Sequence, residues 1–153
     1  MENIIGATFR FSIDLHKDDV SALEYIKNKL NIGYEIAVYG NTCRFSVSNR
    51  KDIEVLISLF DRYNLNTTKY LYYLDFKRAF YLYHENDNTD KRTLIDKLVK
   101  IKNGMNKNRT YFLLPCDHQI VISPSWLLGI IEGEGSFFLD RNKPSTNFFD
   151  FTY

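Results

Sequence analysis

Residues 126–137 read WLLGIIEGEGSF, an apolar stretch interrupted by three glycines and two glutamates. Its first two glycines, Gly129 and Gly133, are four residues apart and therefore lie on one face of a helix. Each glycine inside a helix costs about 1 kcal/mol relative to alanine, so two of them indicate close packing against a second helix. The preceding Ser123-Pro124-Ser125 predicts where this helix begins. Glu134 is expected at its end.

The composition is that of a globular protein. The chain has 153 residues, of which 44% are hydrophobic and 25% charged, enough for one compact domain or two incomplete halves of a larger one. No apolar run reaches the roughly 18 residues of a membrane span, so no membrane partner is expected. The N-terminus suggests neither a signal nor a transit peptide, and Cys43 and Cys116 are expected to be reduced thiols without metal-ligand spacing.

Hydrophobic periodicity predicts an α+β arrangement. The expected elements are a strand over residues 8–15, a helix capped by Asp18-Asp19 and running to Leu30, a hairpin turning at Gly40-Asn41, and helices over 50–62 and 68–83. Residues 86–110 are polar and basic, which indicates a linker with a helical turn around residues 94–101. Residues 119–122 are strand-like.

One face of the predicted sheet is polar. Alternation places Arg10, Ser12, Arg44 and Ser46 away from the apolar side chains. A polar sheet face is usually a solvated one, but a curved face with Arg and Ser can also lie in a major groove and contact base edges. The sequence leaves both interpretations open.

A basic segment stands out although the net charge is only +1. Residues 90–109 contain seven cations against two acids: Lys91, Arg92, Lys97, Lys100, Lys102, Lys107 and Arg109 against Asp90 and Asp96. A solvated linker would explain such a segment. A nucleic-acid contact would also explain it, because binding depends on where the basic residues lie and not on the total charge.

The stretch 126–137 resembles the signature of the LAGLIDADG homing endonucleases and intron maturases, with Leu127, Gly129, Ile131, Glu132, Gly133, Glu134 and Gly135 at the defining places. The resemblance implies αββαββα repeats with a saddle-shaped antiparallel sheet. In that family two such helices pack side by side and bring two carboxylates together, so Glu134 is expected to be catalytic and to bind a divalent cation, Mg²⁺. Gly129 and Gly133 would form the helix-packing surface.

The resemblance extends upstream of the motif. The segment around Tyr63–Lys69 matches a family pattern in which a lysine lies near the cleavage centre, which makes Lys69 a catalytic candidate. Asn64 stands where the family usually has proline, and a plain surface role for Lys69 stays open. The implied organisation is the remainder of a first repeat over 1–85, a basic linker over 86–122 and the start of a second repeat over 123–153, both repeats incomplete.

The expected function is site-specific, metal-dependent DNA cleavage of the intron-homing type, inactive in this chain alone because one of two motifs is present. The expected partners are double-stranded DNA and a second motif helix, in cis or from another chain. Two alternatives stay open: a maturase that binds group I intron RNA and assists splicing, and a non-functional remnant of such a reading frame. A composition typical of A/T-rich coding, together with the family's intron-encoded members, suggests a mitochondrial location.

Overall fold

The computed structural model describes residues 6–85 and 90–135, so Ser136 and Phe137, the last two residues of the stretch 126–137, lie outside the described residues. The chain divides into two compact units, Met1–His118 and Gln119–Tyr153. The first contains every described element except the last helix. Among the described residues, no helix is long and apolar enough to cross a membrane.

The first unit contains a three-stranded antiparallel sheet in the order β1-β3-β2. Its strands are β1 (Phe11–His16), β2 (Ala37–Tyr39) and β3 (Thr42–Val47). The two-residue turn between β2 and β3 falls at Gly40-Asn41, as predicted. On the inner face β1 and β3 place Phe11 opposite Val47, Ile13 opposite Phe45 and Leu15 opposite Cys43.

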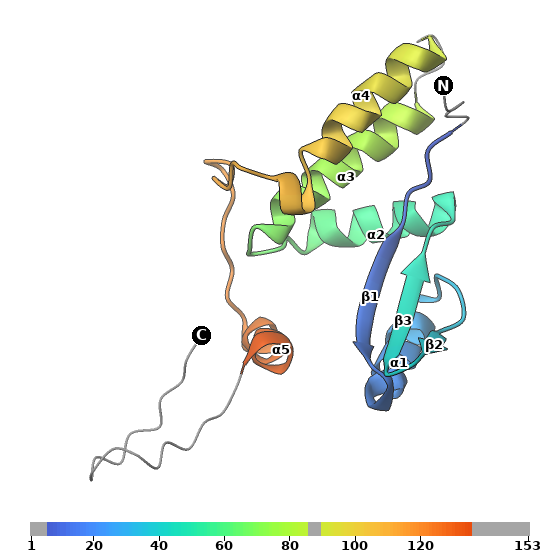
Figure 1. Ribbon diagram of the computed structural model, residues 1–153. Coiled ribbons are helices and arrows are strands. Elements are labelled where there is room, and N and C mark those ends of the chain that lie inside the picture. Colours follow the sequence, from blue (N-terminus) through green and yellow to red (C-terminus); the bar gives the residue numbers. More distant parts are fainter. Residues whose placement is uncertain (1–5, 86–89, 136–153) are drawn as a thin grey trace, which may run out of the picture. The chain divides into compact units, whose positions relative to one another are not determined.

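Helices α1 (Val20–Leu30) and α2 (Arg50–Arg62) lie against the inner face of the sheet (Figure 1). The third helix, α3 (Lys69–His84), packs against α2, and all three are close to the predicted ranges. The core forms where Leu23, Ile53 and Phe80 meet the sheet residues Phe45 and Val47, all of them essentially inaccessible to solvent. Burial of side chains this large supplies most of the stability of a small domain.

The connection from α1 to β2 depends on left-handed backbone. Asn31 has φ 53° and ends α1, and Gly33 follows with φ 85°. The Gly33 N–H donates to Asp52 Oδ2 at 3.0 Å, which ties this turn to the start of α2. A Cβ at Gly33 would lie 2.5 Å from Cε2 of the Phe45 ring, so glycine alone fits here without displacing the core.

The segment expected to be a linker contains a packed helix. α4 (Lys91–Asn103) is longer than the predicted turn around residues 94–101. Its apolar side chains Leu94, Ile95 and Leu98 pack with Ala79 of α3 in a second core cluster, and Figure 1 shows α3 and α4 side by side and antiparallel. Asp90 accepts a hydrogen bond from Thr93 N at 3.1 Å and caps this helix.

One local prediction is confirmed in position only, and another is wrong. Asp19 is the N-cap residue of α1, as predicted, but its side chain makes no capping hydrogen bond, and a 3₁₀ turn, η1 (Lys17–Asp19), precedes the helix. The strand-like residues 119–122 form no strand, and Ile120, Val121 and Ile122 are exposed. Alternating apolar residues favour an extended segment, but they do not specify the neighbouring strand to which a β-strand must form backbone hydrogen bonds.

Candidate nucleic-acid interface

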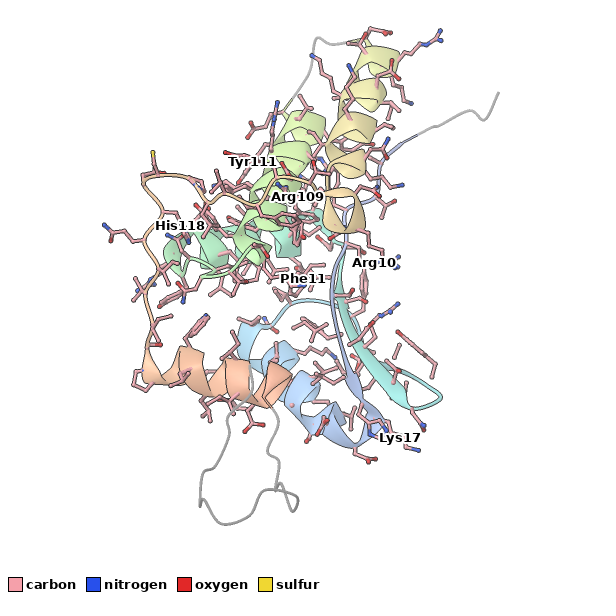
Figure 2. All side chains as sticks on the ribbon, turned by 60° about the vertical axis from the view of Figure 1, so that its left-hand side comes forward. Arg10, Phe11, Lys17, Arg109, Tyr111 and His118 are labelled. Carbon is pink, nitrogen blue, oxygen red and sulfur yellow. The ribbon has the colours of Figure 1, made fainter. Side chains whose placement is uncertain are left out.

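The outer face of the sheet carries the four residues that the sequence analysis selected for nucleic-acid contact. Ser12 lies opposite Ser46 in the β1–β3 ladder, and Arg44 lies opposite Asp14. Arg10 comes directly before β1, where the alternation of exposed and half-buried residues already runs. Figure 2 labels Arg10 and Lys17 at the two ends of β1. The four side chains therefore share one polar face.

An ion pair dominates the electrostatics of this face. Arg44 Nε donates to Asp14 Oδ1 at 2.5 Å and Arg44 Nη2 donates to Asp14 Oδ2 at 2.6 Å. These hydrogen bonds lower the pKa of Asp14 and raise the pKa of Arg44, so both groups are charged at neutral pH. The Arg44 guanidinium also lies 5.3 Å from the centroid of the Tyr39 ring. The sequence analysis missed Asp14, although its alternation with Ser12 already placed it on this face.

Lys69 is the first residue of α3 and is exposed. Its backbone N–H donates to Thr67 Oγ1 at 3.3 Å, which helps to begin the helix. Among the described residues the Lys69 ammonium forms none of the ion pairs of this unit: Lys27–Glu35, Arg44–Asp14, Arg50–Glu54, Lys77–Asp61 and Arg109–Asp75. A cation in this position is available to an external anion.

The second unit presents the motif helix α5 (Pro124–Glu134). Ser123 caps it by accepting from Trp126 N at 3.1 Å, with Pro124 in the first turn, as the sequence predicted. Glu134 is the last helical residue. The helix ends at Gly135, whose N–H donates to Ile131 O at 2.8 Å.

The predicted packing surface of α5 is open. A Cβ built on Gly129 or on Gly133 meets no described atom within 4 Å, and Leu127, Leu128 and Ile131 are exposed. The described residues contain no group of three His, Cys, Asp or Glu side chains that could hold a metal ion. Lys69 belongs to the first unit and Glu134 to the second.

A further feature that the sequence analysis missed is the docking of Arg109 on α3. Its guanidinium pairs with Asp75 and lies 5.2 Å from the centroid of the Tyr72 ring, and Nη2 donates to Leu71 O at 3.4 Å. Figure 2 labels Arg109 beside α3. His118 stacks on the Tyr70 ring with centroids 4.2 Å apart. Sequence separations above 30 residues leave no local pattern by which these contacts could be recognised.

The sequence of this chain was compared with models of known protein families. A family model described as LAGLIDADG endonuclease matches residues 2–80. This range excludes the motif stretch 126–137, so it is evidence separate from the motif. It includes the sheet, α1, α2 and the first part of α3.

Two curated fungal proteins are similar in sequence. The chain is 31% identical over 147 residues to the probable intron-encoded endonuclease Cox1-I1b of Schizosaccharomyces pombe, a match covering 94% of this chain and 36% of that protein. It is 34% identical over 112 residues to probable intron-encoded endonuclease 2 of Neurospora crassa, covering 65% and 24% of the two chains. The chain thus spans about a quarter to a third of the curated relatives it matches.

Solved structures of LAGLIDADG endonucleases are also similar to this chain. The LAGLIDADG homing endonuclease I-GzeII in complex with its DNA target aligns with a TM-score of 0.73 at 27% identity, over 90% of this chain and 53% of that one. The LAGLIDADG meganuclease I-CpaMI bound to uncleaved DNA aligns with a TM-score of 0.73 at 26% identity, over 92% and 52% of the two chains.

Proposed function

Because this chain belongs to the LAGLIDADG endonuclease family, we propose that it forms part of a site-specific, metal-dependent DNA endonuclease of the intron-homing type. The observation that carries the proposal is the alignment of 90% of the chain with a family member in complex with its DNA target. The intron-encoded endonucleases among its relatives support the homing role.

DNA recognition is assigned to the outer face of the sheet. Arg10, Ser12, Arg44 and Ser46 offer hydrogen-bond donors and acceptors of the kind that contact base edges in a major groove. Arginine suits this role because its planar fork can donate two parallel hydrogen bonds to guanine. In the free protein Asp14 occupies that fork, so binding would exchange one bidentate partner for another.

Cleavage is assigned to Glu134 with Lys69 as a second candidate. A divalent cation such as Mg²⁺, when bound, would polarise the scissile phosphate and lower the pKa of the attacking water. Glu134 would supply one hard oxygen ligand to it, and Lys69 would offset negative charge on the phosphate. One carboxylate is too few for such a site, so the proposal includes a second acidic helix, in cis or from another chain, packed on Gly129 and Gly133.

The proposed setting is a mitochondrial intron. Besides the two fungal endonucleases, the chain is 30% identical over 133 residues to the uncharacterized mitochondrial protein RF1 of Saccharomyces cerevisiae, of which it covers 26%. The proposed division is the one expected from the sequence: first repeat 1–85, linker 86–122 and second repeat from 123. The maturase alternative shares the requirement for basic surfaces, but the relatives named as intron-encoded endonucleases favour DNA cleavage over it.

The test of DNA recognition begins with the full chain and a library of random DNA duplexes. Repeated selection for binding should enrich one consensus sequence, which the double variant Arg10→Gln/Ser46→Ala should no longer enrich. In a protein that also carries a second acidic helix, the consensus duplex should be cut in the presence of Mg²⁺, and Glu134→Gln should abolish cutting while leaving binding nearly unchanged. Selection that yields no consensus would contradict the assignment of the sheet face.

Asp14→Asn gives a sharper test of the same face. The substitution removes the carboxylate that occupies the Arg44 fork, so duplex affinity should rise about fivefold, the scale of one surface charge contact of about 1 kcal/mol. Glu24→Gln is the matched control because it changes the net charge equally at an exposed position of α1, outside the sheet. Fluorescence anisotropy measures both affinities, and equal gains for the two variants would show an effect of net charge alone.

A further inference from the structure

A cleft of about 510 Å³ lies between α3 and α4, the two helices that pack side by side in Figure 1. Arg78 and Leu82 of α3 line it together with Lys97, Lys100 and Ile101 of α4. No residue of the sheet contributes to it. The cleft is therefore separate from the face assigned to target recognition.

Three cations converge on this cleft without a compensating acid. Arg78, Lys97 and Lys100 are exposed, and within the described part of the chain none of them forms an ion pair. The one carboxylate that lines the cleft, Asp75, is already paired with Arg109. The arrangement leaves three unneutralised positive charges on one surface.

Folding does not account for this convergence. Cations near a helix C-terminus interact favourably with the helix dipole, and Lys100 lies in the last turn of α4. Lys97 and Arg78 lie further inside their helices, where the interaction with the helix dipole is weak because it is confined to the last turn. Like charges brought together repel one another, and a merely solvated helix face would not require a cation from a second helix.

We propose that this cleft binds the phosphodiester backbone of a nucleic acid, as a contact surface separate from the sheet. An arginine fork and two lysine ammonium groups are the donors that phosphate recognition uses. The apolar side chains of Leu82 and Ile101 line the cleft alongside these donors, so a sugar-phosphate strand would meet charge together with apolar surface. Such contacts carry little sequence information and add affinity and orientation.

The experiment compares two triple variants of the full chain. Arg78→Gln/Lys97→Gln/Lys100→Gln removes the cleft charges, and Lys29→Gln/Lys51→Gln/Lys91→Gln removes three exposed charges outside both the cleft and the sheet face. The probes are a DNA duplex of random sequence and an RNA duplex of the same sequence, each titrated over a range of salt concentrations. The cleft variant should bind at least one probe roughly tenfold more weakly at low salt, with a salt slope reduced by about two to three.

Each outcome decides the proposal. Loss confined to the DNA duplex or to the RNA duplex identifies which nucleic acid the cleft takes, whereas equal losses in the two triple variants would overturn it. Thermal melting checks the fold of each variant. Should the cleft variant unfold, amide shift mapping on the wild-type chain decides instead: perturbation at Arg78, Lys97 and Lys100 supports the proposal, and perturbation confined to the strands refutes it. Failure of the sheet-face selection leaves this test intact, because its probes carry no target sequence.

Discussion

At the scale of single residues, Gly33 is the position where backbone and core constrain each other most closely. Its φ of 85° already disfavours any residue with a side chain, and the Phe45 ring and Ser46 carbonyl oxygen fill the space where a Cβ would stand. Phe45 is fully buried and belongs to the main core cluster, so its ring cannot move away at low cost.

Gly33→Ala should therefore destabilise the first unit by about 2–4 kcal/mol, combining left-handed strain with overpacking. Gly40→Ala is the matched control, because Gly40 has a φ of 60° but a Cβ there would meet no atom of residues 6–85 or 90–135 within 4 Å. Strain alone should cost the control about 1–2 kcal/mol. Thermal melts followed by circular dichroism measure both, and equal losses would mean that Phe45 accommodates the extra methyl group.

At the scale of elements, a polar network joins α2 to α3. Tyr73 Oη lies 2.5 Å from Asp61 Oδ1 and 3.0 Å from the Ile57 carbonyl oxygen, and Lys77 Nζ lies 2.6 Å from Asp61 Oδ2. Burial by itself would raise the pKa of Asp61, but hydrogen bonds from Lys77 and Tyr73 outweigh it and lower the pKa. The pKa of Tyr73 is raised, first by burial of its hydroxyl group and second by its hydrogen bond to Asp61.

The lowered pKa of Asp61 fixes the sign of a pH effect. The folded state binds this proton more weakly than the unfolded chain, so the stabilisation is complete above the unfolded carboxyl pKa of about 4 and is lost as pH falls through the folded value. Asp61→Asn should lower stability at neutral pH by about 1 kcal/mol, since Asp61 is partly exposed. Its loss of melting temperature on acidification should be smaller than that of wild type.

Glu24→Gln serves as the control for Asp61, because Glu24 is an exposed carboxylate on α1 outside this network. It should retain the wild-type dependence of melting temperature on pH. An Asp61→Asn variant that loses as much stability in acid as wild type would place the titrating group elsewhere.

The glycines of α5 give a prediction whose sign depends on the partner helix. Among the described residues a methyl group at Gly129 meets no atom within 4 Å, so Gly129→Ala should favour the helix by about 1 kcal/mol and raise amide protection over α5 in hydrogen exchange. In a protein that contains the second acidic helix, the same change should lower the melting temperature through overpacking. Glu132→Gln is the control, with little effect in either protein. Stabilisation by Gly129→Ala in both settings would remove Gly129 from the helix interface.

Most elements of the first unit were predictable because apolar residues recur along each one at the spacing typical of a strand or of a helix. Alternation located β1 and β3, helical spacing located α1, α2 and α3, and Gly40-Asn41 located the hairpin turn. The spacing of Leu94, Ile95 and Leu98 could also have predicted a packed α4, but the density of charge around them favoured a linker. Residues 119–122 show the converse case, in which alternating apolar residues predict a strand and the structure assigns none.

At the scale of the whole molecule, the pairings between distant residues were not predictable. Alternation placed Arg44 on the outer face, but only the β1–β3 register sets it opposite Asp14, 30 residues away. The same holds for Arg109 and Asp75, 34 residues apart. For the candidate site, the sequence predicted that Arg10, Ser12, Arg44 and Ser46 share one face of the sheet and that residues 126–134 form a helix. The occupied arginine fork and the basic cleft depend instead on how helices and strands are brought together.

The different accessibility of the two cysteines allows unfolding of the sheet to be followed by thiol alkylation. Cys43 lies at the centre of the sheet, fully inaccessible, with its Sγ 3.1 Å from the His16 carbonyl oxygen, whereas Cys116 is exposed. Since alkylating reagents react with accessible thiolates, Cys116 should be modified at once and Cys43 only when the sheet opens. The slow rate, read by mass spectrometry in a Cys116→Ser chain, then measures the frequency of unfolding without denaturant. Destabilised variants such as Gly33→Ala should shorten this delay about tenfold for each 1.4 kcal/mol of stability that they lose.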